Sequence, residues 1–338
     1  MVLKKSVVVV FIFVVFVVEL FVYATNRNDS TSTDSMIHRV PTFDINKSID
    51  FCGEGVPLYS QDILERFERE ILKNAHWHSE MTILFKRTGK YFPLIEKILK
   101  EENVPNDFKY LCIIESGLSN AVSPVGASGF WQIMKTTGKE YGLVVNKEVD
   151  ERYHLEKSTR VACKYFKRAY KKFNSWTLSA ASYNIGISGL ARRLTKQNSE
   201  NYYDLLLNSE TSRYVFRILA VKQILTNPEA FSFTFNESEK YKPVPCHEVT
   251  VDTTVTNFTA WAENQDINYK MLKLFNPWLR GNTLINRDSI KYVIRIPEGL
   301  VYKFSKSVLD SVLVSDTIPE QVVPAPLLAP TDSLSENE

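Results

Sequence analysis

The stretch "YLCIIESGLSNAVSPVGASGFWQIM", residues 110–134, places one carboxylate where an apolar segment gives way to a loop. Spacings of three and four put four side chains on a single helix face, those of Phe108, Leu111, Cys112 and Glu115. Glu115 should therefore face the apolar side, where burial disfavours the charged form and raises its pKa. A carboxyl that keeps its proton near neutral pH can act as a general acid. The alternative is a glutamate that ends a helix and pairs with a lysine.

The loop after Glu115 favours the catalytic interpretation. Residues 116–139 contain no acidic side chain, and their glycines let backbone N–H groups approach a ligand. Trp131 offers a flat apolar surface and Gln132 an amide, a combination that suits a sugar. A buried tryptophan with a capping glutamine explains the same pair, so both interpretations stay open at this point.

Three motifs, in order along the chain, resemble those of the lytic transglycosylases with a goose-lysozyme-like domain. "ESGLSNAVSPVGASGFWQIM", residues 115–134, is similar to the family's Glu-Ser signature, with Ser-Pro-x-Gly-Ala-x-Gly and a Trp-Gln or Met-Gln pair after it. "AASYNIG", residues 180–186, resembles the Ala-Tyr-Asn-x-Gly element. "ENYYDLLLNSETSRYVFRILA", residues 200–220, resembles the segment that closes the sugar groove. The resemblance covers residues 61–228 and implies a lysozyme-like all-α domain. Within it, the segment "YFPLIEKILKEENVPNDFKYLCIIES", residues 91–116, also resembles one membrane-bound subfamily.

The resemblance implies a role for each matching position. Glu115 would be the single catalytic acid and base. Tyr183 would stabilise positive charge at the anomeric centre, and Asn184 would orient the reacting groups. The other substrate-binding positions would line the glycan groove, and they are Ser123, Gly126, Gln132, Met134, Glu210 and Tyr214. Ser182 and Ile185 depart from the alanine and the small residue that the family usually has, and we expect Ile185 to narrow the site.

No second carboxylate accompanies Glu115 in the motif, whereas ordinary retaining glycosidases use two carboxyl groups roughly 5–5.5 Å apart. The resemblance implies that Glu115 acts twice at the MurNAc-β-1,4-GlcNAc bond of peptidoglycan. It would protonate the bridging oxygen and then deprotonate the C6 hydroxyl of the muramoyl unit, which attacks C1 and leaves a 1,6-anhydro end. This attack is intramolecular and needs no metal or cofactor. Two alternatives stay open: a lysozyme-like muramidase that uses water, and a non-catalytic peptidoglycan-binding protein.

The N-terminus and the overall charge indicate an exported protein. Residues 1–24 combine two lysines with an apolar run that ends at Ala24, which is typical of a signal peptide or a membrane anchor. We therefore expect the protein in the periplasm or cell envelope, attached to the membrane if the segment is not cleaved. With 41 basic and 39 acidic residues, the net charge is only +2. This balance excludes a nucleic-acid binder held by charge and leaves peptidoglycan glycan strands as the expected partner.

The rest of the chain divides by composition. Residues 25–60 are polar and predict a tether, and residues 299–338 predict a disordered tail. Residues 61–240 carry helical periodicity and predict an all-α domain. Its predicted helices cover residues 61–72, 91–102, 106–116 (capped by Asn106 or Asp107), 156–173, 176–184 and 211–226.

Residues 241–298 predict a small β-α-α-β domain that resembles a LysM peptidoglycan-binding module. The match is degenerate, because Val251, Asp252 and Thr253 replace the usual Gly-Asp-Thr of the first loop. Glycan binding and a purely structural role both remain open for this domain.

The four cysteines suggest two environments. Cys112 and Cys163 fall inside helical patterns and should be small core residues. Cys52 and Cys246 flank the central region and could form a disulfide in an oxidising compartment, although the sequence does not supply their distance.

Overall fold

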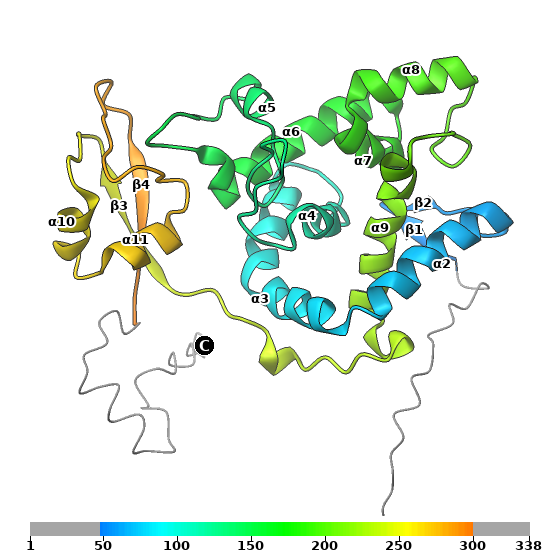
Figure 1. The fold of residues 1–338 in the computed structure, drawn as a ribbon, viewed down its shortest axis with the longest axis horizontal. Helices are drawn as coiled ribbons and strands as arrows, with labels where there is room; N and C mark the ends of the chain where they lie inside the picture. The colour runs from blue at the N-terminus through cyan, green and yellow to red at the C-terminus, as the bar shows by residue number, and fades with distance from the viewer. Residues whose placement is uncertain (1–47, 300–338) are drawn as a thin grey trace, which may run out of the picture. The chain divides into compact units, whose positions relative to one another are not determined.

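The computed structural model describes residues 48–299, and these are mainly helical, with two small antiparallel sheets (Figure 1). The predicted signal or anchor, most of the predicted tether and the predicted tail from residue 300 lie outside the described residues. The chain divides into two units, Met1–Val40 and Pro41–Glu338, and the described residues belong to the second. Between residues 48 and 299, no helix is long and apolar enough to span a membrane.

A hairpin and a helix begin the described part of the chain. β1 (Asp50–Phe51) pairs antiparallel with β2 (Glu54–Gly55), and α2 (Gln61–Ala75) follows. The hairpin falls in the segment that the sequence assigned to the tether. It is ordered because Phe51 is fully buried and packs edge-on against Phe108, with ring centroids 5.3 Å apart.

The second helix, α3 (His78–Glu101), is longer than the sequence predicted. The predicted start at Tyr91 was wrong. The helix begins a turn after α2 because Met81, Leu84 and Phe85 add an apolar stripe that is buried against the core.

α4 (Phe108–Ser116) lies at the centre of the helical domain, with α3, α6, α7 and α9 around it (Figure 1). The other α-helices of this domain are α5 (Lys135–Glu140), α6 (Leu155–Phe173), α7 (Trp176–Ile185), α8 (Ile187–Gln197) and α9 (Ser209–Thr226). Short 3-10 helices are η2 (Glu151–Tyr153), η3 (Pro228–Phe231) and η4 (Glu237–Glu239). The predictions of helices at the positions of α2, α4, α6, α7 and α9 are confirmed, whereas α5 and α8 were not predicted.

The core of this domain is built around the first residue of α4. The ring of Phe108 lies 4.0 Å from that of Phe166 on α6 and 5.6 Å from that of Trp176 on α7, measured between centroids. Cys112 and Cys163 are fully buried in the same cluster, as predicted. α4 is therefore fixed from several sides before its C-terminal residues reach the site.

Asp107 precedes α4, but its carboxylate does not cap the helix. It accepts hydrogen bonds from the backbone N–H of Cys52 at 2.8 Å and from Lys222 Nζ at 2.7 Å. The predicted capping role is therefore replaced by a contact between the hairpin and α9. Cys52 and Cys246 are both free thiols, so the disulfide that the sequence left open is not formed.

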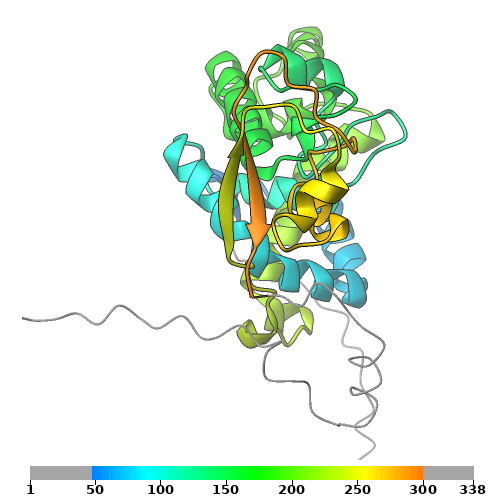
Figure 2. The ribbon, with the colours of Figure 1, turned by 90° about the vertical axis from the view of Figure 1, so that its left-hand side faces the viewer.

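The C-terminal domain has the predicted β-α-α-β order. β3 (Cys246–Val251) is followed by α10 (Phe258–Glu263), α11 (Tyr269–Phe275) and β4 (Tyr292–Pro297). β3 and β4 pair antiparallel along their whole length, and Figure 2 shows the pair beside the two helices. The fully buried side chains of Phe258, Leu272 and Ile294 join the layers.

Asn276, at the C-terminal end of α11, is a structural residue. Its side chain is fully buried, donates to the carbonyl oxygens of Leu272 and Arg295 at 3.0 and 2.7 Å, and accepts from the Arg295 N–H at 2.8 Å. These bonds fasten α11 to β4 and satisfy an otherwise costly buried amide.

The segment before α6 contacts the C-terminal domain. Val149 is fully buried in that domain's apolar cluster and forms an isolated antiparallel bridge with Leu279. Next to it, the Asp150 N–H donates to the Trp278 carbonyl at 2.8 Å. One backbone segment therefore joins the two cores.

Candidate active site

Glu115 lies in the last turn of α4, where the helix ends at Gly117 in the left-handed conformation, with φ +60°. Two guanidinium groups satisfy the carbonyl oxygens at this end. Arg217 donates to Ile114 O at 2.9 Å, and Arg87 donates to Gly117 O at 2.7 Å. The carbonyl end of a helix carries partial negative charge, so both cations stabilise the end that presents Glu115.

The carboxyl of Glu115 is partly buried and accepts a hydrogen bond from the hydroxyl of Tyr214 on α9. Burial raises the pKa of Glu115 to about 7, and the charge of Glu210 also raises it, against the lowering effects of Tyr214 and Arg217. The rise agrees with the prediction from the apolar helix face. A large fraction of Glu115 therefore keeps its proton at neutral pH.

The end of α7 and the start of α9 supply the next polar groups. Asn184 donates to Glu210 Oε1 at 2.9 Å and accepts from the hydroxyl of Thr211 at 2.6 Å, so its amide orientation is fixed. The hydroxyl of Tyr183 donates to the carbonyl oxygen of Trp131 at 2.7 Å. Burial raises the pKa of Tyr183 well above its ordinary value, and the nearby Glu115 adds to the rise.

The loop between α4 and α5 is held by its own side chains. Gln132 adopts a left-handed backbone, with φ +45°, and its amide nitrogen donates to Ala121 O at 3.0 Å and to Gly129 O at 2.8 Å. Ser123 Oγ accepts from the N–H of Ala127 at 3.0 Å. Both residues were predicted to bind substrate, and the bonds that they form here shape the loop.

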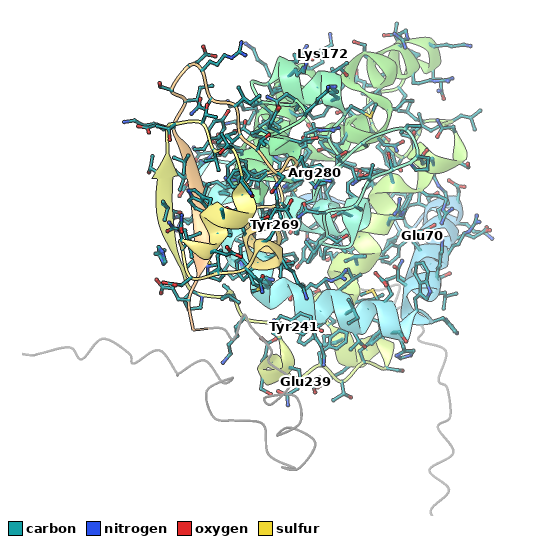
Figure 3. All side chains as sticks on the ribbon, turned by 60° about the vertical axis from the view of Figure 1, so that its left-hand side comes forward. Glu70, Lys172, Glu239, Tyr241, Tyr269 and Arg280 are labelled. Carbon is teal, nitrogen blue, oxygen red and sulfur yellow. The ribbon has the colours of Figure 1, made fainter. Side chains whose placement is uncertain are left out.

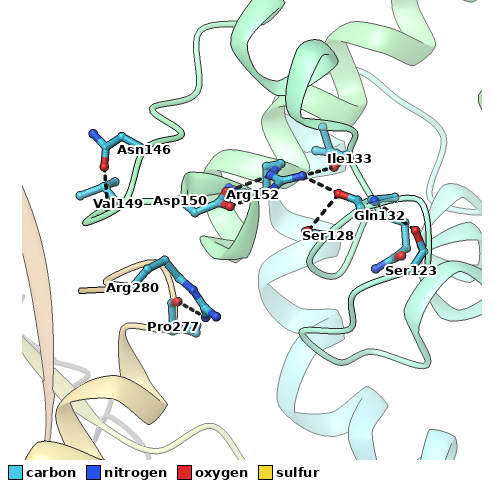
Figure 4. Close-up of polar contacts among 12 residues, drawn as sticks. Ser123, Ser128, Gln132, Ile133, Asn146, Val149, Asp150, Arg152, Pro277 and Arg280 are labelled. Carbon is cyan, nitrogen blue, oxygen red and sulfur yellow. Dashed lines mark hydrogen bonds and ion pairs between the residues drawn. The ribbon is translucent and has the colours of Figure 1, made fainter. Parts of the chain in front are cut away.

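Arg152 holds the same loop from outside, although no motif in the sequence marks it. Its guanidinium is paired with Asp150 at 2.7 Å and donates to Gly126 O at 2.8 Å and Ile133 O at 3.1 Å (Figure 4). Both members of the pair are buried, which is costly for charges unless they are paired and hydrogen-bonded. The run of charged residues 150–152 reads as a solvated turn in the sequence and gives no local signal of this burial.

Gly129 is required by a close approach between this loop and η2. Its φ is +79°, and a Cβ atom there would overlap the carbonyl oxygen of Arg152 and lie 2.9 Å from its carbonyl carbon. Gly126 also has a positive φ, +84°, but has open space beside it. The two glycines therefore serve different purposes: one admits a neighbouring backbone and the other only makes a turn.

Trp131 does not provide a surface for a sugar, and that interpretation was wrong. The side chain is fully buried, and its indole N–H donates to the hydroxyl of Thr159 at 2.8 Å. The domain core takes the ring because α6 covers this side of the loop. Met134, by contrast, is 41% exposed and can contact a ligand.

The predicted residues thus fall into two connected groups. Tyr214, Tyr183 and Glu210 act on the Glu115 carboxyl, and Asn184 joins this group through Glu210. The second group is the loop that holds Ser123, Gly126, Gln132 and Met134, and the hydrogen bond from Tyr183 to the Trp131 carbonyl connects it to the first. A carboxyl that keeps its proton near neutral pH beside fixed polar side chains can serve as a general acid.

Comparison with known proteins identifies the two domains by family. Residues 92–206 match the family Transglycosylase SLT domain, and residues 247–299 match the family Soluble lytic transglycosylase C-terminal LysM-like domain. The chain is 27% identical over 279 residues to membrane-bound lytic murein transglycosylase D of Escherichia coli strain K12, and equally to that of strain O6:H1. The aligned part is 78% of this chain and 59% of each relative, so the chain spans under two thirds of their length.

Proposed function

We propose that this chain is a peptidoglycan lytic transglycosylase, on the premise that it contains a transglycosylase SLT domain followed by a LysM-like domain. The observation that supports the proposal most is the state of Glu115. Its carboxyl is partly buried, is oriented by Tyr214 and has a pKa of about 7, so that it can give up and recover a proton at neutral pH.

In the proposed reaction, protonated Glu115 donates its proton to the oxygen that bridges MurNAc and GlcNAc. The C1–O bond breaks, and positive charge develops at C1 of the muramoyl ring. The carboxylate then removes the proton from the C6 hydroxyl of the same ring, and the C6 oxygen forms a bond to C1. The products are a free GlcNAc end and a 1,6-anhydromuramoyl end, and Glu115 has its proton again.

The neighbouring residues support these reaction steps. Because the hydroxyl proton of Tyr183 is committed to the Trp131 carbonyl, the lone pairs of its oxygen are left to face positive charge at C1. Asn184 is fixed by Glu210 and Thr211, so it can orient the substrate without losing further side-chain freedom.

Hydrolysis by water is the second candidate, and one observation favours it. The charge of Glu210 acts on Glu115, which makes Glu210 a possible second carboxylate. We expect it to serve instead as the anchor of Asn184, because its Oε1 already accepts that hydrogen bond.

Mass spectrometry of digested peptidoglycan tests the proposal and separates the two candidates. We expect 1,6-anhydro ends, which are lighter by one water than the reducing ends that a hydrolase makes. Glu115→Gln should abolish cleavage, and Glu210→Gln should slow it without changing the type of end. Reducing ends from the unaltered protein would support the hydrolase, and turnover by Glu115→Gln would contradict both candidates.

We also propose a location in the cell envelope. The E. coli relatives are named membrane-bound murein enzymes, and the apolar N-terminal segment of this chain agrees with export or anchoring. Fractionation of cells that express the chain with and without residues 1–24 tests this location. Soluble protein inside the cell in both cases would contradict it.

The LysM-like domain is proposed as a second contact with glycan. A cavity of about 440 Å³ lies between the loop after β3 and α10, with Asn257 and Trp261 in its wall. Sedimentation with insoluble peptidoglycan, before and after deletion of residues 241–298, tests this contact. Equal sedimentation would leave the domain a structural role.

A further inference from the structure

A cavity of about 380 Å³ opens beside α4, between α2, α3 and α9. Its apolar floor is made by buried Leu84, Ile113 and Val221. We call it the side pocket and define it by the eight polar or aromatic residues of its wall, which are Glu70, Lys73, Asn74, Trp77, Glu80, Glu210, Arg213 and Arg217.

Trp77 gives the side pocket an exposed aromatic face. It lies at the turn between α2 and α3 and is 58% exposed, although large aromatic side chains are mostly buried in folded proteins. The ammonium of Lys73 lies 5.9 Å from the centre of its ring. A ligand that enters the cavity can therefore meet an apolar surface and a positive charge together.

Two guanidinium groups in the wall are held in place by the fold. Arg213 is paired with Glu70, whose side chain is 1% exposed. Figure 3 labels Glu70 on α2. Arg217 is fixed by its hydrogen bond to the Ile114 carbonyl. Preordered donors bind anionic groups with little further loss of side-chain entropy.

Other charges in the side pocket lack ionic partners. Within residues 48–299, no opposite charge lies within ion-pair distance of Lys73, Glu80 or Glu210. The wall therefore offers unpaired charges of both signs around an apolar floor. A ligand with carboxylates, an ammonium group and small apolar side chains would complement it.

We infer that the side pocket binds the peptide stem of the muramoyl residue beside the bond that is cleaved. This inference rests on the proposed function. The stem is a short peptide that carries carboxylates and, at its diamino acid, an ammonium group. A neutral sugar ring would not complement the charges of this wall, because six of the thirteen lining residues are ionisable.

The position of the side pocket fits a group attached to the reacting sugar. Glu210 belongs to its wall and also accepts the hydrogen bond from Asn184 in the reaction site. Ile114, next to Glu115 in the chain, lines it as well. A stem that leaves the muramoyl ring at the reaction site reaches the side pocket past these residues.

A pair of matched substrates tests the inference. One is glycan strands with uncrosslinked stems, and the other is the same strands after an amidase has removed the stems. We expect the full-length protein to cleave the first with a kcat/KM about tenfold higher, the effect of one or two charged contacts. In Lys73→Ala and Trp77→Ala this ratio should fall towards one.

Control variants separate the side pocket from surface effects. Lys172→Ala on α6, which lies away from Glu70 in Figure 3, and Tyr59→Ala, at a 95% exposed ring, should keep the ratio of the unaltered protein. A ratio near one in the unaltered protein would overturn the inference, even if anhydro products show that the proposed function holds. An equal fall in kcat/KM on both substrates in Trp77→Ala would also overturn the inference and would indicate a glycan subsite.

A binding measurement keeps the inference testable if no cleavage is found. The stem tetrapeptide L-Ala-γ-D-Glu-diaminopimelate-D-Ala is titrated into the full-length Glu115→Gln protein by calorimetry. We expect saturable binding that weakens about tenfold in the Glu115→Gln protein with Lys73→Ala added. No binding, or equal binding by the two proteins, would contradict the inference whatever the outcome for catalysis.

Discussion

Replacing Glu115 with glutamine should stabilise the protein at alkaline pH and leave its stability almost unchanged in acid. The glutamine keeps the size of the side chain and an oxygen that can accept from Tyr214, so it preserves the contacts that the carboxyl makes. It removes only the ability to ionise. The substitution therefore isolates the part of the unfolding free energy that is lost because the folded protein keeps this carboxylate away from water.

The magnitude follows from the pKa of Glu115, which burial raises from 4.5 to about 7. Because the folded state binds this proton more tightly than the unfolded state, the stabilising contribution is complete below about pH 4.5 and is lost as pH rises through about 7. A difference of about 2.5 pKa units corresponds to about 3 kcal/mol of unfolding free energy. Glutamine does not titrate, so the variant should exceed the unaltered protein by about this amount at about pH 8.

Urea unfolding of both proteins between about pH 4 and about pH 8 measures this difference at each pH. Taking the difference between the two proteins cancels the other titrating groups that they share. Glu65→Gln, at an exposed glutamate of α2, is the matched control for the loss of one negative charge. A difference that does not grow with pH, or a variant that is less stable at about pH 8, would refute the assignment of a raised pKa to Glu115.

Three further substitutions have definite expected outcomes. Tyr214→Phe removes a hydrogen bond that favours the ionised form of Glu115, so the alkaline limb of the pH–rate profile should move to higher pH; a shift to lower pH would contradict this. Gly129→Ala should destabilise by about 3 kcal/mol through overlap with the Arg152 backbone, whereas Gly142→Ala, which has a similar φ but open space, should cost about 1 kcal/mol, as thermal unfolding can show. Arg152→Met leaves the buried carboxylate of Asp150 unpaired and frees the carbonyls of Gly126 and Ile133 in the loop between α4 and α5, so it should lower stability by about 3 kcal/mol and raise KM more than it lowers kcat. Restoration of KM by Arg152→Lys would support a positioning role, and an unchanged KM in the methionine variant would exclude it.

Local signals in the sequence were sufficient to predict the helices and strands whose apolar side chains recur at regular spacings along the chain. Helical periodicity located α2, α6, α7 and α9, and strand-like segments around two short helices located the β-α-α-β domain. The position of Glu115 on the apolar face of α4 was also visible, since residues at i, i+3, i+4 and i+7 share one face whatever packs against it. The raised pKa of Glu115 follows from the burial of that apolar face.

Contacts between distant segments were decided only by the tertiary structure. Tyr214 is 99 residues from the Glu115 that it orients, and Arg152 reaches back to the Gly126 carbonyl across 26 residues. The sequence does not say on which side of a loop a neighbouring helix will lie, so it could not decide whether Trp131 faces a sugar or the core. α6 covers that side, and burial of the indole with a satisfied N–H is the more stable outcome. The sequence by itself thus determined which carboxyl would hold a proton, and packing between elements determined which groups surround it.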